Sequence, residues 1–164
     1  MLFPELPGSS KTLVFTASSF LSKSDAESFI LRLSNFIHAW QSHGSGLSAA
    51  SKLIANRVLI VAIDESSVSA SGCSLDSMTH FLKAEAPSID WFNRTYVLYR
   101  PYSDSVVSIN DDWSVTEMSE FHALMKADKI GVAAEVINTT VMTLASARLN
   151  LVEKASESWH AKTL

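Results

Sequence analysis

Apolar residues spaced for one face of a helix predict three helices. Each predicted helix begins at a serine and carries apolar residues at steps of three and four. In the first and third, a glutamate three residues after the serine completes the pattern of a capping box. The helices are predicted to begin at Ser24, Ser74 and Ser114, and to end at Gly44, at Pro87 and after Met125. Residues 139–151 fit either a helix or a strand, and both assignments stay open.

Runs of β-branched and aromatic residues predict the strands. Residues 58–63 are apolar without alternation, which is typical of a central strand covered on both faces. Further strands are predicted at residues 12–16, 48–55, 94–100, 105–109 and 136–137. Strands 94–100 and 105–109 are expected to form a hairpin. Because several strands follow one another without an intervening helix, we expect an α+β fold, with a mainly antiparallel sheet covered by three to four helices.

The ends of the chain bear on domain organisation. Residues 1–11 contain two prolines and a Gly-Ser-Ser turn signal, so we expect a flexible N-terminal arm ahead of a single domain spanning 12–164. The first residues lack the basic start and apolar stretch of a signal peptide, and no apolar run reaches the ~18 residues of a membrane span. We therefore expect a cytoplasmic protein with no membrane span.

Composition excludes several classes of function. The 164 residues are 47% hydrophobic and 18% charged, as in a soluble globular domain, and the formal net charge is −4. No cluster of Lys and Arg is present, so we expect no nucleic-acid partner. The single cysteine, Cys73, excludes disulfide frameworks and zinc or iron–sulfur sites with several cysteines. The sequence gives no sign of a cofactor or a resident metal.

The strand that ends in Asp64-Glu65 has the form of a Walker B segment, in which Asp holds magnesium and Glu orients the attacking water. The P-loop that such chemistry requires is absent, because Ser10-Lys11-Thr12 lacks the glycines and precedes a strand instead of opening a helix. The simpler interpretation is that Asp64 and Glu65 are a polar end to a buried strand.

A second candidate site lies at the start of the second predicted helix. A cysteine such as Cys73 at a helix N-terminus feels the positive end of the dipole, which favours the thiolate. The same amides, with Ser71, Gly72 and Ser74 nearby, can instead receive a small anion. The structural alternative is a partly buried cysteine in a turn, with Ser71 or Ser74 as the N-cap.

Two histidines complete the catalytic alternative. His43 is expected at a helix C-terminus and His160 in a tail that docks through Trp159. One hypothesis is an enzyme with Cys73 as nucleophile and His43 or His160 as base, oriented by Asp64 or Glu65. Another is a divalent-cation site formed by Asp64, Glu65 and Asp76, whose hard oxygen ligands suit magnesium or calcium.

Several motifs together resemble those of a family of small uncharacterised bacterial proteins, found largely in the Bacteroidetes and often labelled "ABC transporter ATPase". The resemblance spans nearly the whole chain, and its most specific part is the stretch from Ala70 to Ser77. The remaining motifs are Trp40, His43-Gly44, Asn56-Arg57, Asp64-Glu65-Ser66, Asn138-Thr139 and Ser158-Trp159-His160. The resemblance implies little about function, and the residues of this chain contradict the ATPase label because the P-loop is missing. The last four residues of this chain depart from the usual ending of the family.

These observations favour a small binding or interaction module without catalysis of its own. The expected partner is a small anion or another protein, and a homodimer is possible on general grounds. The cysteine-dependent enzyme and the divalent-cation site are the two alternatives.

Overall fold

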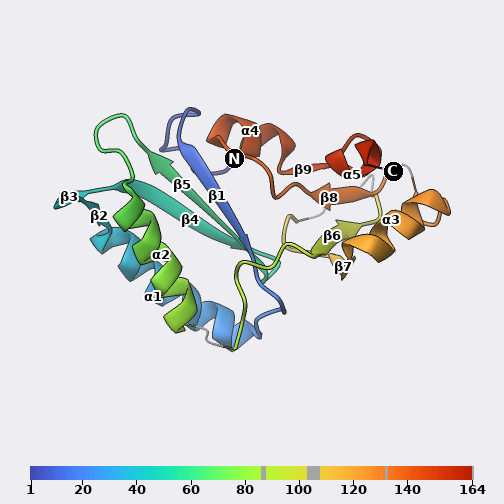
Figure 1. Ribbon diagram of the computed structural model, residues 1–164, viewed down its shortest axis with the longest axis horizontal. Coiled ribbons are helices and arrows are strands. Elements are labelled where there is room, and N and C mark those ends of the chain that lie inside the picture. Colours follow the sequence, from blue (N-terminus) through green and yellow to red (C-terminus); the bar gives the residue numbers. More distant parts are fainter. Residues whose placement is uncertain (86–87, 103–107, 132, 164) are drawn as a thin grey trace.

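A computed structural model of the chain describes residues 1–85, 88–102, 108–131 and 133–163 (Figure 1). The described strands are β1 (Lys11–Thr16), β2 (Gln41–Ser42), β3 (Ser45–Gly46), β4 (Ser48–Ile54), β5 (Val58–Asp64), β6 (Tyr96–Arg100), β7 (Ser114–Glu117), β8 (Glu135–Ile137) and β9 (Val152–Lys154). The helices are α1 (Lys23–Ala39), α2 (Gly72–Glu85), α3 (Met118–Lys126), α4 (Leu144–Asn150) and α5 (Trp159–Lys162). The sheets are antiparallel, so the predicted α+β class is confirmed.

The first half of the chain forms a three-stranded sheet in the order β1-β5-β4. Helices α1 and α2 lie on the same face of this sheet (Figure 1). Their apolar residues pack with alternate residues of β5, including Leu59, Val61 and Ile63, in the main core. Strand β5 is central and apolar from Val58 to Ile63, as predicted, because both of its faces are covered.

The second half of the chain covers the other face of that sheet. Ile60 on β5 packs with Leu98 on β6, Ile137 on β8 and Leu151 after α4. Strands β6 to β9 form a second sheet in the order β7-β6-β8-β9, against which α3 packs through Phe121. The strands therefore divide between two main sheets and a small β2-β3 hairpin, whereas the sequence predicted one mainly antiparallel sheet.

Two local predictions were wrong, and a third falls largely outside the described residues. The cap of α1 is Ser22, whose side chain accepts from the Asp25 amide, instead of Ser24. The third helix begins four residues after Ser114, because residues Ser114–Glu117 pair with β6 as strand β7. Strand β6 thus has β7 and β8 as neighbours, and the predicted hairpin partner at 105–109 lies largely outside the described residues.

The segment 1–11 was predicted to be a flexible arm but is docked. Arg148 on α4 donates hydrogen bonds to the carbonyl oxygens of Leu2, Phe3 and Leu6 at 3.0, 2.6 and 2.9 Å. The Leu6 side chain is buried in a small core with residues of β5 and α4. The segment is therefore held to the domain by Arg148, a residue that lies far away in the sequence.

The C-terminal quarter resolves the open assignment at 139–151. Thr143 caps α4 by accepting from the Ser146 amide, and the helix is followed directly by β9. The short strand predicted at 136–137 is confirmed as β8. Among the described residues, none of the helices is long and apolar enough to cross a membrane.

Candidate functional site: a groove along the edge of β1

The serines at the start of α2 form hydrogen bonds with each other. The Ser71 hydroxyl accepts from the Ser74 amide at 3.2 Å, and the Ser74 hydroxyl donates to the Ser71 carbonyl at 2.8 Å. This is the N-cap arrangement that the structural interpretation predicted. Cys73 is free and exposed, so the same interpretation was wrong in expecting a partly buried cysteine, and Gly72 faces open space. The hydroxyls that were candidates for holding an anion are thus engaged in starting the helix.

The carboxylates after β5 also have local partners. Asp64 accepts from the Ser66 amide at 3.0 Å, and Glu65 accepts from the Ala70 amide at 2.8 Å. Both bonds shape the loop between β5 and α2. Among the residues that the structure describes, no group of three or more His, Cys, Asp or Glu side chains is arranged to hold a metal ion. The structure therefore does not bring Asp64, Glu65 and Asp76 together as the predicted cation site.

The two candidate base residues lie in different places. His43 is exposed in the β2-β3 turn with φ of 51°, and α1 has already ended at Ala39, so the predicted helix C-terminal position is wrong. His160 is buried in α5, at the opposite end of the molecule from α2 (Figure 1). The structure therefore does not bring His160 to Cys73. Among the described residues, no hydrogen bond joins His43 to Cys73.

His160 belongs to a ring cluster instead. Its Nδ1 lies 3.2 Å from Nε2 of His122, its ring stacks on Trp159 at 3.9 Å, and it meets the Phe121 ring edge-on at 5.2 Å. Burial, together with the nearby His122, lowers the pKa of His160 to about 4. The docked tail that Trp159 predicted is therefore a packing feature in which His160 is neutral at pH 7.

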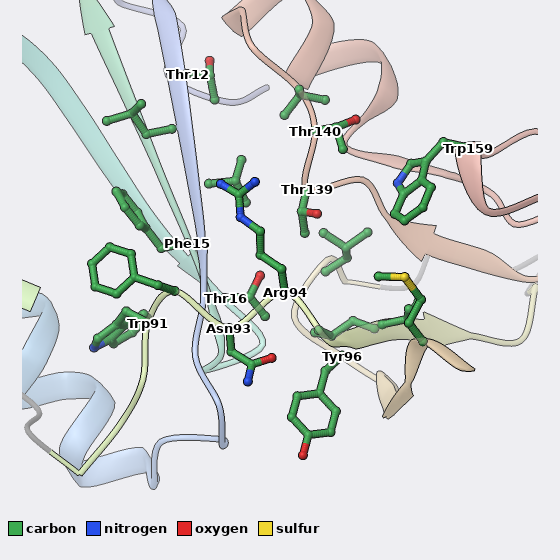
Figure 2. Close-up of a pocket in the computed structure, with 18 of the residues that line it drawn as sticks. Thr12, Phe15, Thr16, Trp91, Asn93, Arg94, Tyr96, Thr139, Thr140 and Trp159 are labelled. Atoms are coloured by element: carbon green, nitrogen blue, oxygen red, sulfur yellow. The ribbon is translucent and has the colours of Figure 1, made fainter. Parts of the chain in front are cut away.

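A groove of about 580 Å³ lies between the two halves of the molecule. It is lined by β1, by residues of the segments 91–98 and 137–142, and by Met118, Trp159 and His160. Figure 2 shows the side chain of Arg94 extending between β1 on one side and Thr139 and Thr140 on the other. This volume falls within the range of small-ligand sites in proteins. We refer to it as the β1 groove.

One wall of the β1 groove is a sheet edge. Strand β1 is an edge strand, because β5 is its only neighbour in the three-stranded sheet. At one end, the Thr12 amide donates to the Met142 carbonyl at 2.9 Å, and at the other end Thr16 forms an isolated parallel bridge with Phe92. The Thr12 amide therefore points away from β5. Since backbone groups alternate along a strand, the amide and carbonyl of Val14 point away from β5 too.

Arg94 supplies the charge in the β1 groove. It is exposed, and no hydrogen bond or ion pair reaches its guanidinium from the residues that the structure describes. No carboxylate is among the described residues that line the groove, and Arg94 is their only permanently charged side chain. In a chain with a formal net charge of −4, this leaves a local positive site without an internal counter-ion.

Two turns of the same kind shape the groove. The Asn93 side chain accepts from the amide and hydroxyl of Thr95 at 3.0 and 2.9 Å, which fixes the loop that carries Arg94. Opposite, the Asn138 side chain accepts from the amide and hydroxyl of Thr140 at 2.8 and 2.7 Å. Both are Asx turns at Asn-x-Thr triplets. These triplets are the sequence signal that could have directed attention to the groove.

Thr12 adds a buried polar group without a partner. The residue is 5% exposed and lines the β1 groove, and its hydroxyl has no hydrogen-bond partner among the described residues. A buried hydroxyl without a partner costs free energy, so native proteins keep few of them. Because Thr12 lines the groove, its hydroxyl is available to hydrogen-bond a ligand there.

Searches against protein-family models, curated proteins and solved structures gave no match for this chain. The similarity to the bacterial family described above therefore stays a prediction.

Proposed function

We propose that this protein is a non-catalytic binding module whose ligand occupies the β1 groove and presents an anionic group to Arg94. The observation that carries the proposal is the guanidinium of Arg94, which has no partner among the described residues, in a groove whose described lining contains no carboxylate. Arginine binds carboxylate and phosphate groups through two parallel hydrogen bonds, so either anion suits this position.

The chemistry of the lining supports binding in preference to catalysis. Beside Arg94, the described lining residues are mostly apolar side chains and threonines, while Cys73 lies on α2 outside the groove. His160 reaches the groove, but its imidazole is held against Trp159 and Phe121 in the ring cluster. A few polar groups in a mostly apolar groove are typical of a ligand-binding site. A cytoplasmic location is part of the proposal, because an exposed free cysteine suits a reducing compartment.

The test is a titration of the ¹⁵N-labelled protein with acetate and, separately, with inorganic phosphate, followed by NMR. We expect shifts concentrated at the backbone amides of Arg94, Thr139 and Val14, which line the groove. The same titration of Arg94→Gln should give shifts at least tenfold smaller, because the charged hydrogen bonds are lost.

The matched control is Lys52→Gln, which removes one positive charge from an exposed side chain on β4, at the opposite edge of the sheet. This variant should titrate like the unmodified protein. Shifts that are scattered over the surface, or that are unchanged in Arg94→Gln, would overturn the proposal.

A further inference from the structure

We infer that the natural occupant of the β1 groove is an extended peptide segment bearing a carboxylate, which pairs its backbone with Val14 and its carboxylate with Arg94. This inference rests on the proposed function and names the class of ligand. It adds to the anion site a second recognition element, the unpaired part of the β1 edge.

Part of the outer backbone edge of β1 is unpaired among the described residues. The edge is closed at Thr12 by Met142 and bridged at Thr16 by Phe92, while no described residue bonds to the outward amide or carbonyl of Val14. A donor and an acceptor on one residue, both facing a groove, match the amide and carbonyl of one residue in an extended peptide. Peptides commonly bind by adding a strand to such an edge.

The unpaired part of the β1 edge is short. The stretch from Thr12 to Thr16 covers four residue steps, or about 13 Å of strand. Because both ends of the stretch are already paired, a long added strand does not fit. A short segment of about four or five residues does fit, with its central residue opposite Val14.

Exposed apolar side chains lie at the rim of the groove. Phe92 is 39% exposed and Met142 is 77% exposed, and both line the groove. These exposed apolar side chains flank the two closed ends of the β1 edge. They offer contacts to apolar side chains on either side of the central residue of a peptide. A small inorganic anion would use none of this surface.

The charge of the groove favours a carboxylate on the peptide. Arg94 is the unpaired cation of the groove, and the described lining residues include no acidic side chain that would repel a carboxylate. The buried Thr12 hydroxyl adds a polar group without a partner at the end of the groove where Met142 lies. The carboxylate of the peptide comes from an Asp or Glu side chain or from a free C-terminus, and the experiment separates these two sources.

The experiment is a phage-display selection of random heptapeptides against the full-length protein, in two formats. One format presents the peptide internally, and the other presents it with a free C-terminus. We expect enriched peptides that carry Asp or Glu in the first format, or a shared C-terminal motif in the second. Synthetic copies should bind Arg94→Gln at least tenfold more weakly, while Lys52→Gln binds as the unmodified protein does.

The backbone pairing has its own readout, which is a scan of N-methyl groups along the best synthetic peptide. Methylation of the residue opposite Val14 should weaken binding at least tenfold, because its amide no longer donates to the strand. Methylation of the two adjacent residues should have little effect on pairing, since their amides face away from β1. The variant Val14→Pro removes the outward amide from the protein side, and the peptide scan remains decisive where this variant fails to fold.

The outcomes separate the two proposals. If acetate or phosphate binds at Arg94 but no peptide is enriched, the peptide assignment is overturned and the anion-binding function stands. If peptides bind but N-methylation has the same effect at every position, pairing with the β1 edge is overturned. If neither anions nor peptides perturb the groove, both proposals fail.

Discussion

The N-terminus of α2 and the β1 groove both present small hydroxyl side chains, but their polar groups are in opposite states. At α2, Ser71 and Ser74 bond to each other, and Glu65 bonds to the Ala70 amide. In the groove, the Thr12 hydroxyl and the Arg94 guanidinium have no partner among the described residues. A motif that attracts attention in the sequence can be fully used by the fold, whereas polar groups that the fold leaves unpaired beside a groove are available to a ligand.

Two measurements test the comparison: the free energy of unfolding and the affinity for a ligand. Changes at the start of α2 should alter stability and leave binding intact. Substitutions of Thr12 and Arg94 in the groove should have a neutral or favourable effect on stability, and loss of Arg94 should weaken binding.

The largest expected effect is a loss of stability at low pH, caused by His160 in the ring cluster that lines the groove. His160 has a folded-state pKa of about 4, against an unfolded value of 6.5. Above pH 6.5 both states are neutral and the stability is complete. As the pH falls from 6.5 to 4, only the unfolded state binds the proton, so about 3 kcal/mol of stability should be lost.

Urea unfolding at pH 7, 5.5 and 4.5 measures this loss, and His160→Gln is the control because it removes the titration. The difference in pH dependence between the two proteins isolates His160 from the carboxylates that both contain. Equal slopes in the two proteins would show that His160 does not stay neutral in the folded state.

The second effect is a gain of stability on Thr12→Val. Valine has nearly the shape of threonine and removes a buried hydroxyl that has no partner. We expect the free energy of unfolding to rise by about 1 kcal/mol, as measured by urea denaturation at pH 7. A loss of stability would show that the hydroxyl is already satisfied in the free protein.

The third effect is a loss of similar size at the other region, on Ser71→Ala. The substitution removes the acceptor for the Ser74 amide and should lower the free energy of unfolding by about 1 kcal/mol. Peptide or anion affinity should be unchanged, since Ser71 does not line the groove. Weaker ligand binding by Ser71→Ala would contradict the assignment of the site to the groove.

The smallest effect on stability is expected for Arg94→Gln. The side chain is exposed and unpaired among the described residues, so the free energy of unfolding should change by less than about 0.5 kcal/mol. Urea denaturation and the anion titration, performed on the same protein sample, should separate intact folding from lost binding. A large loss of stability would show that Arg94 has a structural role.

The elements with a strong local pattern were predictable. The apolar run of β5 and the three- and four-residue spacing of α1 and α2 are local properties, and β5 and α2 formed close to their predicted bounds. Helix α1 formed where its spacing predicts it, but it ends at Ala39, before the predicted stop at Gly44. The start of α3 was not predictable, because Ser114–Glu117 satisfies the capping pattern but is taken by pairing with β6. Tertiary hydrogen bonding there overrides a local preference.

In the candidate site, too, some features follow from local sequence and others depend on tertiary contacts. The sequence by itself determined the cap at Ser71, the polar end of β5 and the Asx turns that shape the loops around Arg94 and Thr139, because these depend on residues two or three positions apart. Only the tertiary structure decided that His160 lies apart from Cys73, and that β1, Arg94 and Thr139 face one groove (Figure 2). Whether a polar group is satisfied depends on neighbours far away in the sequence, and only the folded chain brings those neighbours together.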